Sequence, residues 1–246
     1  MTGVFISKGM TFAIKKGGLK LNLKDGKIAT SLTPSVSIDL CPIWLNLSVQ
    51  HLEKARQWRN KRKSVWLSAN EDLKADTLER EFEHSMQAII SMAIAYDSFY
   101  GTIKNKINLP QTMIDAWKKN RTARYIRISE TLKQAFIIRK KGNAILRQAI
   151  KEIFRFRDMA IHPTGDLEYP VMHPELGVAV EWRFQTFSYM NANMIVQEGL
   201  RRLMKLAQFK KVINKQIETY CPTFLELINP ILKKYEGGNH QTDSSE

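Results

Sequence analysis

The sequence contains little cysteine and no long apolar run. Its two cysteines, Cys41 and Cys221, are isolated among 246 residues. This usage is typical of a reducing compartment and lacks the closely spaced ligand pairs of a zinc site. No run of about 18 uncharged apolar residues occurs, which argues against a transmembrane helix. The first ten residues lack the basic segment and apolar core of a secretory signal. We therefore expect a cytoplasmic protein that uses no membrane, metal or cofactor.

Several well-known functional patterns are also absent. The sequence has no zinc-protease helix, no serine-triad motif and no kinase signature. The Gly17-Gly18 pair lacks the flanking residues of a phosphate-binding glycine loop. No short helix–turn–helix spacing supports a DNA-binding regulator, which is therefore the weakest of the functions considered. There is no internal repeat.

Basic residues are abundant and clustered. Lysine and arginine number 38 against 24 acidic residues, a formal net charge of +14. Residues 1–70 carry 12 basic and 3 acidic side chains, and residues 112–162 carry 13 and 4. Such clustering is the electrostatic footprint of a protein that binds a polyanion such as RNA. Solvated basic helix faces are the alternative, because charge alone does not separate the two.

The first 45 residues have the alternating pattern of β-strands. In residues 19–24 leucines alternate with polar residues, which predicts a strand with one buried face. Asp25-Gly26 fits a two-residue hairpin turn, and residues 36–40 alternate again. The sequence thus predicts a small β appendage over residues 1–45. It is too short to be stable alone, so we expect it to pack on the rest of the chain.

From residue 46 to residue 236 the composition and periodicity are helical. We predict a mainly-α fold, an antiparallel helical bundle with the β appendage at its N-terminal end. Residues 237–246 are polar and are expected to form a disordered tail. The expected elements are a basic helix or turn-rich link at 45–66, helices at 71–106, 111–139, 143–161, 181–208 and 210–220, and a last helical stretch punctuated by Pro222 and Pro230.

One stretch combines an arginine, an acid and a histidine: Arg157, Asp158 and His162, at the end of the predicted helix 143–161. On a wheel of about 100° per residue, Arg157 lies within about 20° of Leu146 and so projects toward the packed side. An arginine there needs anionic partners or a water-filled cleft. Because Pro163 disfavours helical geometry in the residue before it, the helix should end there and His162 can turn back toward Arg157.

This stretch resembles the signature of the HEPN superfamily of helical-bundle ribonucleases and nucleotide-binding proteins. That signature is an arginine, a polar residue, and a histidine after four to six intervening residues near a helix end. The resemblance covers the motif and, more loosely, the bundle from about residue 71 to 208. It implies a metal-independent endoribonuclease that works as a homodimer. His162 would be the general acid or base, Arg157 would stabilise the phosphorane, and Asp158 would orient a motif side chain.

The resemblance also implies a biological setting, since many members serve toxin–antitoxin or antiviral defence. A strongly basic chain would suit an acidic antitoxin or regulatory protein as a partner. The alternative is a non-catalytic helical module that binds RNA, nucleotide or a protein partner. In that case Arg157 would pair with Asp158 or another acid, and His162 would only cap a helix.

Other basic residues are candidates for phosphate contacts with RNA. Three arginines recur every three residues with Tyr125 between them, and others flank the motif helix. Exposed helix faces also carry such residues for solubility alone. The alternative is therefore that these residues do not contact RNA. His173 is predicted to line the cleft or form a turn, and His51 and His84 to be surface or packing residues. The candidate RNA contacts are Arg121, Arg124, Arg127, Arg139, Lys140, Lys141, Arg147, Lys151 and Arg155.

Overall fold

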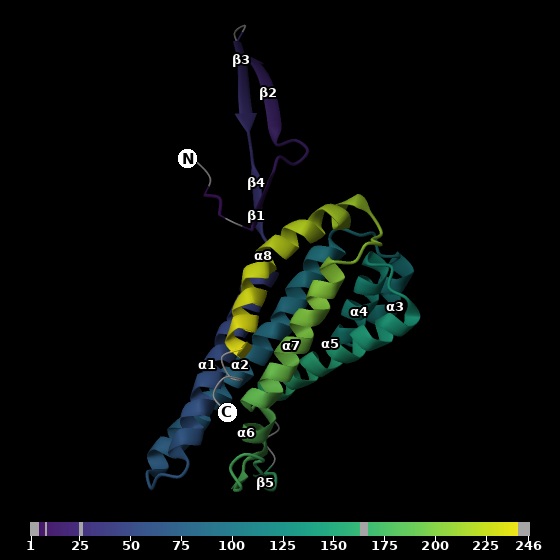
Figure 1. Ribbon diagram of the computed structural model, residues 1–246. Coiled ribbons are helices and arrows are strands. Elements are labelled where there is room, and N and C mark those ends of the chain that lie inside the picture. Colours follow the sequence, from purple (N-terminus) through teal and green to yellow (C-terminus); the bar gives the residue numbers. More distant parts are fainter. Residues whose placement is uncertain (1–4, 8, 25–26, 163–166, 241–246) are drawn as a thin grey trace. The chain divides into compact units, whose positions relative to one another are not determined.

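The fold is mainly α-helical with a small N-terminal β unit, as predicted (Figure 1). The computed structural model describes residues 5–7, 9–24, 27–162 and 167–240. The chain divides into two compact units, Met1–Leu40 and Cys41–Glu246. The helical unit therefore begins several residues before the position expected from composition.

The N-terminal unit is a long antiparallel hairpin in two parts. Its strands are β1 (Met10–Ala13), β2 (Leu19–Lys24), β3 (Lys27–Leu32) and β4 (Ser35–Ile38), with β1 paired to β4 and β2 to β3. The amide of Thr33 donates to the carbonyl of Gly18 at 2.7 Å, so the two ladders follow one another. A turn at Gly17, with φ of +83°, separates β1 from β2.

The alternation of residues 19–24 correctly predicts a strand. The prediction that one face of this strand is buried is wrong. Leu21 and Leu23 are 66% and 77% exposed, because among the described residues of this unit no second layer covers the hairpin. The predicted Asp25-Gly26 turn lies outside the described residues.

The helical unit is built on two long neighbouring helices, α1 (Cys41–Val65) and α2 (Glu71–Lys104), and most of the later helices pack on one or both of them (Figure 1). Helices α5 and α7 both contact α2, α4 lies on α2 and α5, and α8 lies on α1 and α7. The elements are α1 (Cys41–Val65), α2 (Glu71–Lys104), α3 (Gln111–Lys119), α4 (Arg124–Ala135), α5 (Lys140–Ile161), β5 (Val171–Met172), β6 (Ala179–Val180), α6 (Trp182–Thr186), α7 (Tyr189–Ala207) and α8 (Lys215–His240).

Local sequence explains the start of α2 and its close packing on α7. The side chain of Asn70 accepts a hydrogen bond from the amide of Leu73 at 2.9 Å, which caps the helix. Further along, the buried hydroxyl of Tyr96 donates to the carbonyl of Gly199 at 3.0 Å. A Cβ on Gly199 would meet the sulfur of Met92 at 2.6 Å. Any larger residue here would require Met92 to shift, so glycine favours the close approach of α7 to α2.

Several predicted element boundaries differ from those of the structure. The single helix expected over 111–139 is divided into α3 and α4 by a turn in which Arg121 has a φ of +46°. Gly142 lies inside α5. Pro222 and Pro230 lie inside α8, whose Phe224 and Ile228 are buried in the core. Burial of such side chains opposes the cost of about 3 kcal/mol that an interior proline imposes on a helix.

A buried ion-pair network joins α1, α2, α7 and the turn between β5 and β6. The side chain of Arg62 is fully buried and donates to Glu81 at 2.6 Å and to Glu175 at 2.7 Å. Glu81 also accepts from the amide of Tyr189 at 3.0 Å, at the start of α7. Glu175 binds Arg59 as well, whose Nε lies 3.1 Å from both carboxylate oxygens. Ion pairs and one backbone hydrogen bond thus connect α1, α2, the start of α7 and the turn between β5 and β6.

Removal of one charge from this network should destabilise the protein strongly. Glu81→Gln leaves the buried Arg62 without its closest counter-ion, which is expected to cost about 3–5 kcal/mol of unfolding free energy. Urea denaturation measures this loss. The matched control is Glu83→Gln in the same helix, where the partner Arg80 is half-exposed and the expected change is below about 1 kcal/mol. Equal losses in the two variants would contradict the role given to the network.

The network also predicts a dependence of stability on pH. Burial alone would raise the pKa of Glu175, but hydrogen bonds from Arg59 and Arg62 and their charges lower this pKa to about 2. A lowered pKa stabilises the fold fully above the unfolded value of about 4.3, and the contribution is lost as pH falls from there toward 2. Wild type should therefore exceed Glu175→Gln in thermal stability near neutral pH, and the difference should shrink in acid. A difference that stays constant down to about pH 3 would contradict this assignment.

Candidate active site at the end of helix α5

Arg157 lies on the side of α5 that packs against the bundle, as the helical wheel indicates. Its side chain is 21% exposed, and its guanidinium covers the ring of Phe154 at 4.3 Å. One nitrogen is 3.7 Å from a carboxylate oxygen of Asp97 in α2, and Nε donates to Asp158 at 2.9 Å. The guanidinium is thus held in place while part of it still reaches solvent.

Asp97 connects this arginine to a second one. Arg124, at the start of α4, donates to Asp97 at 2.6 Å and stacks on the ring of Tyr100 at 4.5 Å. Two arginines from different helices therefore flank one carboxylate. Of the two acids that hold Arg157, Asp158 is the more exposed. An incoming phosphate would displace that contact most readily, because an exposed ion pair gains little free energy.

His162 marks the end of α5. Its amide donates to the carbonyl of Asp158 at 2.9 Å, and its φ of −123° and ψ of 70° lie outside the helical region. This matches the ending that Pro163 predicts. The imidazole is exposed and, within the part of the chain that the structure describes, makes no hydrogen bond to Arg157. The structure brings both residues to one helix end without joining them; residues 163–166 lie outside the described part.

The other predicted basic residues are spread along α4 and α5, and some of them are paired with acids. Arg155 is paired with Glu152 at 2.8 Å, and Arg147 is paired with Glu130 of α4. Lys151 is exposed, as are Arg121, Arg139, Lys140 and Lys141. Residues 139–141 stand at the opposite end of α5 from the motif, about 27 Å away at 1.5 Å per residue. They cannot contact the same nucleotide as Arg157.

The other histidines considered from the sequence lie away from the motif. His173 is buried in the turn between β5 and β6, where its Nδ1 accepts from the amide of Glu175 at 3.2 Å. Burial, and then the charge of Arg62, lowers the pKa of His173. His51 and His84 lie with their Nδ1 atoms 3.2 Å apart, although 33 residues separate them in sequence. A single sequence gives no signal that would bring these two together.

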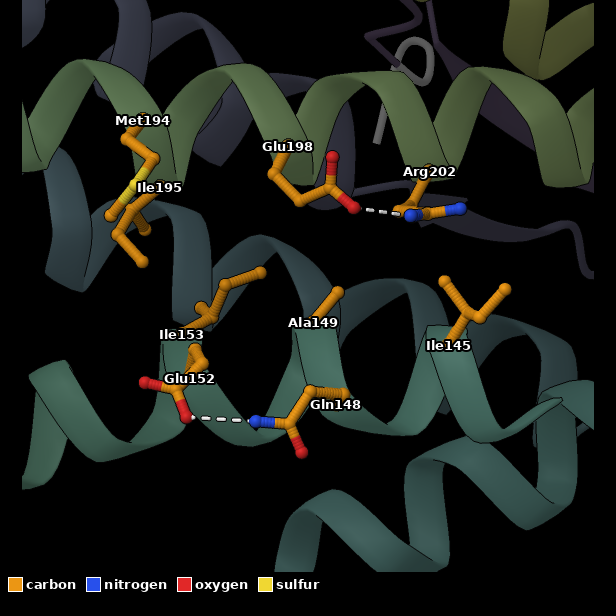
Figure 2. Close-up of a pocket in the computed structure, with 9 residues that line it drawn as sticks. All are labelled: Ile145, Gln148, Ala149, Glu152, Ile153, Met194, Ile195, Glu198 and Arg202. Atoms are coloured by element: carbon orange, nitrogen blue, oxygen red, sulfur yellow. Dashed lines mark hydrogen bonds and ion pairs between the residues drawn. The ribbon is translucent and has the colours of Figure 1, made fainter. Parts of the chain in front are cut away.

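An apolar groove runs between α5 and α7, on the same helix that carries the motif (Figure 2). Its volume is about 360 Å³. Figure 2 shows Ile153 and Ile195 between the helices, with the Glu198–Arg202 contact on α7 and the Gln148–Glu152 contact on α5. The remaining lining residues are Ile145, Ala149 and Met194.

Two features are absent from the part of the chain that the structure describes. No helix there combines the length and apolar character needed to span a bilayer. No three histidine, cysteine or acidic side chains there come together as ligands for a metal ion.

Comparison with known proteins assigns no family. No protein-family model matches the chain, and no curated protein or solved structure is significantly similar to it. The geometry of the described residues is therefore the basis for a functional proposal.

Proposed function

We propose that this protein is a metal-independent endoribonuclease whose active site is formed by Arg157 and His162. One observation supports this most: a guanidinium anchored by two acids and an exposed imidazole occur together where α5 ends. The pair resembles the HEPN signature, and the chain has the basic charge suited to RNA.

The chemistry is a transesterification. The ribose 2′-hydroxyl attacks the adjacent phosphorus, the bond to the 5′-oxygen breaks, and the products carry a 2′,3′-cyclic phosphate and a 5′-hydroxyl. His162 transfers a proton, because an imidazole can act as a general acid or base. Arg157 stabilises the extra negative charge on the phosphorane. Asp158 and Asp97 keep that guanidinium in position. DNA has no 2′-hydroxyl and is not cut by this route.

A homodimer completes the site in this proposal. One histidine does not readily remove the proton from the nucleophile and protonate the leaving oxygen in the same step, so a second copy supplies the second imidazole. The groove between α5 and α7 is the proposed contact face. Ile145 and Met194 on its border are 45% and 55% exposed, and a second copy would bury them.

The proposal also covers the cellular location and biological role of the enzyme. We place it in the cytoplasm, in a toxin–antitoxin or antiviral defence system. An acidic antitoxin or regulator suits a chain of net charge +14.

A second candidate is a non-catalytic helical module that binds RNA, nucleotide or a protein partner. The ion pairs of Arg157 favour it, because they also explain the residue as a tie between α5 and α2. The two candidates differ in whether RNA is cut.

The cleavage test uses total RNA in the presence of EDTA. The wild-type protein should cut it, and Arg157→Gln and His162→Asn should each lower the rate by at least about 100-fold, the usual contribution of such groups. Arg80→Gln is the control, because this half-exposed arginine of α2 is not a candidate RNA contact, is paired with Glu83 and should keep near-normal activity. Circular dichroism confirms that each variant is folded. RNA that is bound but left intact by the wild type would favour the non-catalytic candidate.

The dimer is tested separately. Met194→Asp places a charge in the apolar groove and should convert a dimer to a monomer in sedimentation experiments, with loss of cleavage. Leu67→Asp is the control, since Leu67 is 96% exposed in the turn after α1 and should not alter the mass. A dimer that persists in Met194→Asp would exclude the groove as the contact face.

A further inference from the structure

A polar pocket between α1 and α2 lies outside the Arg157–His162 motif. Its volume is about 430 Å³, and its lining residues are Lys54, Gln57, Trp58, Lys61 and His84. The α1 residues recur at spacings of three and four, so they share one face of that helix. His84 comes from the adjacent face of α2. The pocket thus combines two amines, an indole and an imidazole.

The charge of this pocket is positive. Its lining contains two lysines and no acid. The nearby acids are already engaged: Glu53 accepts from Arg56 at 2.8 Å and from Gln57 at 3.1 Å, and Glu83 accepts from Arg80 at 3.1 Å. The lysines are therefore the charges available to an incoming anion.

His84, which lines the pocket, is in contact with His51. His51 Nδ1 is 3.2 Å from His84 Nδ1, and the ring centroids are 5.4 Å apart. This contact fixes the orientation of the imidazole that lines the pocket. Burial is the main cause that lowers the pKa of both rings, and the charge of Lys54 lowers both further. The pair therefore offers neutral hydrogen-bonding groups beside the cationic lysines.

Trp58 supplies an aromatic surface beside these charges. The ammonium of Lys61 lies 4.6 Å from the centre of the indole. Aromatic side chains on which bases stack, next to cations that hold the backbone, are how proteins bind single-stranded nucleic acid. A base-paired strand cannot offer the face of a base in this way. The other tryptophan of this region, Trp66, differs because its neighbour Lys74 is paired with Glu71 at 2.8 Å.

We propose that this pocket, lined by Lys54, Gln57, Trp58, Lys61 and His84, binds single-stranded RNA. One unpaired base stacks on Trp58, and the phosphates beside it contact the two lysines. The choice of RNA as the nucleic acid rests on the proposed function. The site holds a segment of the strand other than the bond that is cleaved.

Binding is measured with a fluorescent RNA of about 12 nucleotides that is 2′-O-methylated throughout. This probe has no free 2′-hydroxyl, so its binding is independent of any cleavage. Trp58→Ala should weaken binding by about 5- to 100-fold, the range found when one base-stacking residue is removed. Trp58→Phe keeps an aromatic face and should restore most of the affinity. Lys54→Gln and Lys61→Gln should each weaken binding and lower its salt dependence.

Matched controls come from the second lysine–tryptophan pair. Trp66→Ala and Lys74→Gln remove the same side chains where an acid already neutralises the lysine, and they should leave affinity unchanged. Affinity that stays within about twofold in Trp58→Ala, or that falls equally in Trp66→Ala, would overturn the proposal. So would a wild-type protein that does not bind the probe. Binding that depends on Trp58 in a protein that cuts no RNA would support this site while refuting the nuclease.

Discussion

The buried guanidinium of Arg62 is the charge on which the arrangement of the helical unit depends. It is bound by Glu81 of α2 and by Glu175 of the turn between β5 and β6. Glu81 in turn receives the first amide of α7. An unpaired charge in this position would be very costly, so all of these segments must be in place together. Glu175 belongs to the turn between β5 and β6, and this turn is therefore anchored to α1.

The three surfaces with functional potential all belong to this framework. α5 presents Arg157 at its end and also borders the apolar groove, so catalysis and dimer formation are proposed for the same helix. α1 and α2 carry the pocket at Trp58. In this view the motif cleaves the RNA, and the groove is the face on which a second copy packs. The pocket adds affinity for an unpaired strand. Each depends on separate residues, so each is open to refutation without the others.

The sequence predicts what is local and misses what is assembled at long range. The helix start at Asn70, the end of α5 before Pro163 and the inward side of Arg157 all follow from capping, steric and periodicity rules. The continuity of α8 through two prolines does not, because burial of its apolar face in the bundle opposes their cost. Asp97 as a partner of Arg157 and the contact between His51 and His84 join distant helices, and no pattern within one segment encodes them.

The most direct test of the central claim is the chemistry of the RNA ends. Mass spectrometry of fragments produced by the purified protein in EDTA should find 2′,3′-cyclic phosphates and 5′-hydroxyls, formed only when both Arg157 and His162 are present. Intact RNA, or fragments that end in 3′-hydroxyls and 5′-phosphates, would contradict the account.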